Sequence, residues 1–170
     1  MNIAGIEPES FVDGPGIRYV IFAQGCPHRC RGCHNPQTWD PRISNEISHK
    51  VIISDIGKHL DMIQGVTFSG GDPIYQPYDT ACLILDIKEK YPELDIWVYT
   101  GYTFEDLLND AKDGDHDIFN ILNNIDMLVD GKYDEALRDL TLSFRGSSNQ
   151  RLIGRSIIQE RIKNLIDCSE

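Results

Sequence analysis

Three of the five cysteines of this chain stand within eight residues, at Cys26, Cys30 and Cys33. They directly follow an apolar run, residues 17–23, that is typical of a buried strand. A cysteine-dense loop at a strand end can close a disulfide, hold zinc or hold an iron–sulfur cluster. Three thiolates are one fewer than a [4Fe–4S] cube or a closed structural zinc site takes, so the missing ligand is the central question.

The length and charge of the chain narrow the class of protein. A chain of 170 residues predicts one domain, residues 1–170, with a full core. The net charge of −11 disfavours binding to nucleic acid. No apolar run is long enough to span a membrane and no secretory leader is visible, so we expect a cytoplasmic protein without a membrane partner. In the reducing cytoplasm, clustered cysteines favour metal binding or thiol catalysis over disulfides.

Strand-like and helix-like patterns alternate along the chain. Strands are expected within residues 1–12 and at 17–23, 66–69, 96–99 and 125–129. Helices are expected at 45–63, where Gly65 would end the helix, at 77–91, from 104, through 118–122, and from 157. This alternation predicts an α/β fold with a mostly parallel sheet and right-handed crossovers. Residues 133–150 show no regular pattern.

Polar and glycine-rich loops follow the predicted strands. Because the carboxyl ends of parallel strands meet at one edge of a sheet, these loops should converge with the cysteines on one site. Gly70 and Gly71 would let a ligand approach the backbone closely, and Asp72 follows them. Asp130 and Lys132 offer a carboxylate and an ammonium for an amino-acid head group or a ribose. Each motif taken alone is also explained by an ordinary turn.

The residues by themselves leave two kinds of metal site open. His28 or His34 could complete a structural Cys3His zinc site, which would make the chain a non-catalytic zinc-binding module. A [4Fe–4S] cluster held by the three cysteines would instead leave one iron without a protein ligand. That iron could then take a substrate or a cofactor.

The set of motifs resembles the radical S-adenosylmethionine enzymes, which combine a C-x3-C-x2-C triad with a strand-end Gly-Gly-acid-Pro turn, here residues 70–73. Asp13-Gly-Pro-Gly16 and Cys33-His-Asn-Pro36 are similar to motifs of glycyl-radical activating enzymes. Three further segments resemble the subfamily that activates anaerobic ribonucleoside-triphosphate reductase: residues 96–102, 128–133 and 144–151. The resemblance covers roughly residues 10–152.

This resemblance implies a partial, open (β/α) TIM-like barrel of the radical S-adenosylmethionine type. Cys26, Cys30 and Cys33 would ligate a [4Fe–4S] cluster, and S-adenosylmethionine would chelate the fourth iron. The implied cofactor-binding residues are Gly32, Cys33, His34, Ser69, Gly70, Gly71, Asp72, Asp130 and Lys132, with Thr100 as a weaker candidate. Two positions depart from many radical enzymes: Gly32 replaces an aromatic residue, and Asp72 replaces the commoner glutamate.

The implied reaction is the reductive cleavage of S-adenosylmethionine to a 5′-deoxyadenosyl radical. That radical would take hydrogen from a glycine of the large catalytic subunit of anaerobic ribonucleoside-triphosphate reductase. Activation of another glycyl-radical enzyme, such as a formate-lyase, and radical chemistry on a small molecule are the alternatives.

The segment around the triad also suggests a second partner. Residues 16–42 carry four arginines against one aspartate, and Arg29 and Arg31 stand among the cysteines. This basic island predicts docking of an acidic electron donor such as flavodoxin. The sequence leaves both a monomer and a homodimer open. Cys82 and Cys168 are expected to be structural or incidental.

Overall fold

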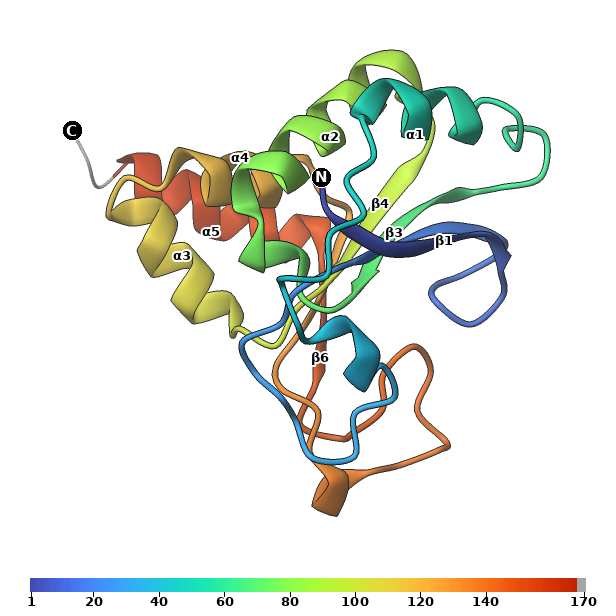
Figure 1. The fold of residues 1–170 in the computed structure, drawn as a ribbon. Helices are drawn as coiled ribbons and strands as arrows, with labels where there is room; N and C mark the ends of the chain where they lie inside the picture. Colours follow the sequence, from blue (N-terminus) through green and yellow to red (C-terminus); the bar gives the residue numbers. More distant parts are fainter. Residues whose placement is uncertain (168–170) are drawn as a thin grey trace.

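A computed structural model describes residues 1–167 and has a mixed α/β fold built on one six-stranded sheet (Figure 1). The strands lie side by side in chain order. They are β1 Ile3–Ser10, β2 Arg18–Ala23, β3 Gly65–Gly70, β4 Asp95–Tyr99, β5 Met127–Asp130 and β6 Arg151–Gly154.

The four central strands, β2 to β5, are parallel, and β1 and β6 are antiparallel edge strands. The predicted parallel sheet is therefore confirmed at its centre, and so is the strand near the amino terminus. Strand β6 was not predicted, because four residues are too few for an alternating pattern to stand out. Within the described residues β1 and β6 do not pair with each other, so the sheet is open.

Within the described residues, five α-helices connect or follow the strands. They are α1 His49–Ile56, α2 Pro77–Lys90, α3 Phe104–Lys112, α4 His116–Asn124 and α5 Arg155–Asp167. Figure 1 shows them gathered away from the cysteine loop (blue) and the loop that precedes β6 (orange), which lie together at the other end of the molecule. The expected capping box is confirmed, since the Asp106 N–H donates to Thr103 Oγ1 and the Thr103 N–H to Asp106 Oδ2, both at 3.2 Å.

The helix expected at residues 45–63 is much shorter, and the role expected of Gly65 is wrong. Residues 45–47 are extended because they bond to the amino terminus: the Ile3 N–H donates to Asn45 O at 3.2 Å, and the Ile47 N–H to Met1 O at 3.1 Å. Helix α1 therefore begins only after Ser48. Gly65 is the first residue of β3, where a Cβ atom would lie 2.4 Å from Asp95 O.

The sheet is covered well enough to bury its central strands. Tyr19, Val20 and Ile21 of β2 are fully buried, as expected for a parallel strand with both faces covered. Among the described residues, no helix has the length and apolar character needed to cross a membrane. The parallel strands direct their carboxyl ends, and the loops that follow them, toward the cysteines.

Candidate functional site

The three clustered cysteines line one cavity of about 200 Å³, which we call the cysteine cavity. Each has a free, half-buried thiol in the loop that follows β2. Loops after β3, β4 and β5 complete the lining, as the topology predicted. The other residues that line it are His28, His34, Asn35, Trp39, Ser69, Gly70, Gly71, Tyr99, Thr100, Gly101, Gly131, Lys132, Tyr133, Arg145, Gly146 and Gln150.

Backbone hydrogen bonds fold the cysteine loop back on itself. The Gly25 N–H donates to Thr38 O at 2.7 Å, and the Cys26 N–H to Trp39 O at 3.2 Å. Inside the loop, the Asn35 N–H donates to Cys33 Sγ at 3.3 Å. This contact holds the Cys33 side chain in place within the loop.

Burial changes the pKa of the other two thiols. It raises the pKa of Cys26, against the lowering effect of the backbone N–H groups of His28 and Arg29. It also raises the pKa of Cys30, where the backbone N–H of Tyr133 opposes it. These two cysteines are thus protonated at neutral pH without a metal, and metal binding would release their protons.

The Gly70–Gly71 turn is packed too closely for any side chain. Gly70 has φ +95°, and a Cβ atom there would lie 2.7 Å from Phe22 Cα. A Cβ atom on Gly71 would lie 2.4 Å from Gly25 O. Gly70 and Gly71 therefore present only backbone to the cysteine cavity, which Ser69 also lines.

Asp72 lies just outside the lining and joins three of the loops. Its buried carboxylate accepts hydrogen bonds from Thr100 Oγ1 at 3.0 Å, from the Gly101 N–H at 2.9 Å and from the Ile74 N–H at 2.9 Å. His28 Nε2 lies 2.7 Å from Asp72 Oδ2. Because these contacts use its acceptor capacity, Asp72 positions the loops and is not free to bind a ligand.

The two histidines considered as zinc ligands have different surroundings. The ring of His28 is tied to Asp72 and meets the edge of Tyr102 at a centroid distance of 4.6 Å. Gly101 makes room for that ring, since a Cβ atom there would lie 2.4 Å from His28 Cδ2. His34 is exposed and packs on Tyr133 at 5.7 Å.

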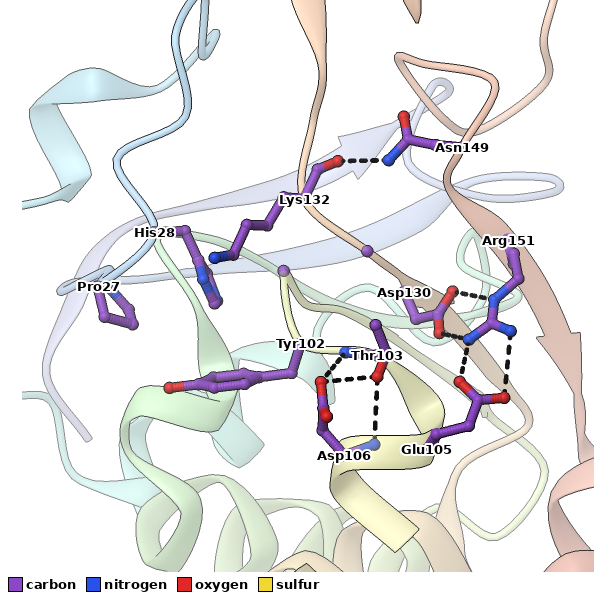
Figure 2. A pocket seen from close by; sticks show the side chains of 12 residues that line it. Pro27, His28, Tyr102, Thr103, Glu105, Asp106, Asp130, Lys132, Asn149 and Arg151 are labelled. Atoms are coloured by element: carbon purple, nitrogen blue, oxygen red, sulfur yellow. Dashed lines mark hydrogen bonds and ion pairs between the residues drawn. The ribbon is translucent and has the colours of Figure 1, made fainter. Parts of the chain in front are cut away.

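A second, larger cavity of about 750 Å³, which we call the outer cavity, adjoins the first (Figure 2). Asp130 lines only this outer cavity, where its carboxylate accepts hydrogen bonds from Arg151 Nε at 3.0 Å and the Phe104 N–H at 2.7 Å. Arg151 also binds Glu105 at 2.6 Å, and these two carboxylates raise the pKa of the arginine. Asp130 is therefore engaged within the protein.

Lys132 and Gly32 complete the set of predicted site residues. Lys132 lines both cavities, and Figure 2 shows its side chain directed toward His28. Gly32, with φ +73°, lies outside the lining of the cysteine cavity. It faces Glu135, whose Oε1 would lie 3.0 Å from a Cβ atom at that position, and Glu135 pairs with Arg31 at 3.0 Å. The segment of residues 133–150 thus contacts the cysteine loop.

The three thiols supply the donors of a [4Fe–4S] cluster with one open iron. Among the described residues, no three His, Cys, Asp or Glu side chains converge closely enough to hold one metal ion. In a [4Fe–4S] cube each thiolate binds a different iron, so the thiols need only line a common space. Cys26, Cys30 and Cys33 meet that requirement.

Comparison with known proteins decides the family. Residues 12–153 match the model of a family described as a 4Fe-4S single cluster domain. The chain is also 39% identical over 156 residues to the anaerobic ribonucleoside-triphosphate reductase-activating protein of Enterobacteria phage T4, covering 89% of this chain and 93% of that protein. This chain belongs to the reductase-activating protein family.

Two bacterial members of the family are similar along most of their length. The protein of Escherichia coli K12 is 37% identical, covering 88% of this chain and 96% of its own. The protein of Vibrio cholerae is 38% identical with the same coverage. The crystal structure of QueE from Escherichia coli aligns with a TM-score of 0.41 and 19% identity over 60% of this chain and 52% of that chain, which is too distant to support a conclusion.

Several residues of the cysteine cavity were not predicted as site residues. Tyr133, Arg145, Gly146 and Gln150 come from the irregular segment before β6. Their one sequence signal was the resemblance of residues 128–133, for Tyr133, and of residues 144–151, for the other three, to the family, and that resemblance names no role for any of them. Of the two cysteines expected to be structural, Cys82 is half-buried on α2 and Cys168 lies outside the described residues.

Proposed function

We propose that this protein is an enzyme that activates anaerobic ribonucleoside-triphosphate reductase by forming a glycyl radical on its large catalytic subunit. The observation that carries the proposal is the sharing of one cavity by Cys26, Cys30 and Cys33 with the Ser69–Gly71 turn. Membership in the reductase-activating family supports the choice of partner. Three thiols beside an exposed backbone turn provide for a cluster and for a polar ligand next to it.

In this proposal the three cysteines hold a [4Fe–4S] cluster, and S-adenosylmethionine binds at the open iron. When bound, the pair supplies the one-electron cleavage of the sulfonium C–S bond and the radical that removes hydrogen from glycine. The protein itself orients the ligands and excludes competing reactions. No general acid or base is required.

The residues around the cluster would divide the work of orientation. The backbone of Ser69, Gly70 and Gly71 would hydrogen-bond the methionine end of the cofactor, with Cys33 and His34 beside it. Asp72 would act through His28 and Thr100, because its carboxylate holds the cysteine loop against the loop after β4. Lys132 is the member of the Asp130-x-Lys132 pair that remains available to a ligand.

In the same proposal, the open edge of the sheet has a functional role. The open sheet would correspond to a partial (β/α) barrel formed by one domain over residues 1–170. The gap between its edge strands would admit a polypeptide, which a closed barrel would exclude. The outer cavity shares His28, Gly101, Gly131 and Lys132 with the cysteine cavity, and it offers a route for the glycine-bearing segment.

The experiment is anaerobic reconstitution with iron and sulfide, followed by S-adenosylmethionine and dithionite. We expect a brown protein that releases 5′-deoxyadenosine and, on mixing with the reductase large subunit, a glycyl radical detected by electron paramagnetic resonance. Deoxyadenosine without a radical on the reductase would point to another substrate. A colourless protein that retains zinc would contradict the proposal altogether.

We further propose that an acidic electron donor such as flavodoxin docks at the basic island. Arg29 and Arg31 are exposed on the cysteine loop, and Arg31 pairs only at the surface with Glu135. Replacing both arginines with glutamate should slow cluster reduction by flavodoxin but not by dithionite. Equal rates with flavodoxin would exclude this docking site.

A further inference from the structure

The cysteine cavity differs in charge from the protein that surrounds it. The chain has 27 acidic and 16 basic residues, yet no aspartate or glutamate lines this cavity. Lys132 and Arg145 line it instead. Two cations without an acidic neighbour in the lining make the cavity a site for an anionic group.

Arg145 makes no ion pair within 4 Å among the described residues, although its charge, after the hydrogen bonds of Thr141, contributes to the lowered pKa of Asp139. Its Nε atom is buried and has no hydrogen-bond partner among the described residues. Two other arginines with buried contacts have ion-pair partners, although Arg18 Nη1 also lacks a hydrogen bond. Arg18 pairs with Asp95 and donates to Val66 O at 3.0 Å, and Arg151 binds Asp130 and Glu105. A buried donor is normally satisfied, so the free Nε indicates a missing acceptor.

The backbone on both sides of Arg145 is held firmly. Phe144 has φ +58°, a conformation that a bulky residue rarely adopts. It is fixed there by a hydrogen bond from Tyr99 Oη to Phe144 O at 2.9 Å and by the edge of its ring against Trp97 at 5.4 Å. On the other side, the Gly146 N–H donates to Gln150 Oε1 at 2.9 Å. This turn presents the Arg145 side chain to the cavity.

We propose that Arg145 binds the carboxylate of the methionine moiety of S-adenosylmethionine, an inference that rests on the proposed function. A guanidinium presents paired N–H donors that match a carboxylate, whereas an ammonium provides only a point charge. The arginine lines the same cavity as the Ser69–Gly71 turn, which would meet the methionine end of the cofactor. Arg145 is therefore a binding residue and takes no part in electron transfer.

The test measures equilibrium binding of two ligands to the reconstituted protein by dialysis. One ligand is S-adenosylmethionine, and the other is its decarboxylated analogue, which keeps the adenosine, the sulfonium and the amino group. Arg145→Gln should weaken S-adenosylmethionine about tenfold or more, as loss of a charge-assisted hydrogen bond does, but the analogue less than twofold. Arg145→Lys should give an intermediate affinity. Arg138→Gln, an exposed arginine in the same segment, is the matched control and should change neither affinity.

Iron and sulfide contents separate the possible failures. If the wild-type protein holds a cluster but binds no S-adenosylmethionine, the proposed function is wrong. If it binds the cofactor and Arg145→Gln binds it equally well, or loses both ligands equally while keeping its cluster, the assignment of Arg145 is wrong. Should Arg145→Gln fail to fold or to hold a cluster, Arg145→Lys decides, and unchanged discrimination between the two ligands overturns the proposal.

Discussion

The cysteine cavity and the outer cavity share a wall but have opposite chemistry. The outer cavity is larger, about 750 Å³ against about 200 Å³, and it contains Glu105, Asp106 and Asp130. All three carboxylates already have partners within the protein, two in Arg151 and one in Thr103. The smaller cavity has no carboxylate in its lining, but it has three free thiols and an arginine with an unpartnered Nε atom.

The comparison shows that unsatisfied groups, and not volume, identify the reactive region. Carboxylates that accept several internal hydrogen bonds stabilise the loops and leave little capacity for a ligand. Free thiols and the unpartnered Arg145 Nε atom keep capacity for a metal or an acceptor. The carboxylates of the outer cavity therefore stabilise the loops that surround the cysteine cavity. The following predictions test this division, beginning with the largest expected effect.

Cys26→Ala should abolish cluster binding, because a cube held by two thiolates loses an anchoring ligand. Iron and sulfide analysis after anaerobic reconstitution measures the loss, and deoxyadenosine formation should disappear with it. Cys82→Ala is the matched control, since this half-buried cysteine does not line the cavity. Full iron content in Cys26→Ala would remove the basis of the comparison.

Asp72→Asn should destabilise the protein by about 3 kcal/mol. The amide group of asparagine would place its own N–H donors against the buried groups that now donate hydrogen bonds to the carboxylate. Urea unfolding of the cluster-free protein at neutral pH gives the change in unfolding free energy. Asp106→Asn, on the exposed cap of α3, should cost only about 0.5–1 kcal/mol. Equal costs would mean that Asp72 stabilises the loops between the two cavities no more than a surface cap stabilises a helix.

Arg151→Gln should destabilise the protein by about 2 kcal/mol while leaving the cluster content unchanged. Removing the arginine leaves the buried Asp130 carboxylate with one strong donor, the Phe104 N–H. Because the Arg151 side chain is half exposed, the cost is moderate. The same urea titration measures stability, and iron analysis measures the cluster. A stable variant without a cluster would place Arg151 in the cofactor site and contradict the division.

Glu105→Gln should have the smallest effect, below about 1 kcal/mol, since the pair with Arg151 is half exposed. The hydrogen bond from Arg151 lowers the pKa of Glu105 from its ordinary value of 4.5. The carboxylate therefore stabilises the folded protein above pH 4.5 and loses this effect as the pH falls through its lower folded-state pKa.

The measurement compares the unfolding free energies of wild type and Glu105→Gln between pH 7 and pH 3, and the difference should shrink toward pH 3. Glu160→Gln, an exposed substitution on α5, provides the control. A difference that grows as the pH falls would show that the pair does not stabilise the fold.

Local patterns in the sequence predicted the central strands, α2, the capping box and the cysteine loop. These features depend on neighbouring residues, such as the apolar run before Cys26 and the Thr103–Asp106 spacing. The prediction failed at residues 45–47, where hydrogen bonds to Met1 and Ile3 override the helical pattern. Contacts between segments more than forty residues apart leave no periodic signal in either segment.

The sequence by itself determined which residues can hold a cluster and that strand-end loops would surround them, because triad spacing and strand alternation are local. Tertiary structure alone decided what each polar residue does. Asp130 is engaged by Arg151, Asp72 joins three loops, and Arg145 reaches the cysteines from a segment more than one hundred residues away. A side chain is free or satisfied only through its neighbours in space, and the folding of the sheet brings those neighbours together.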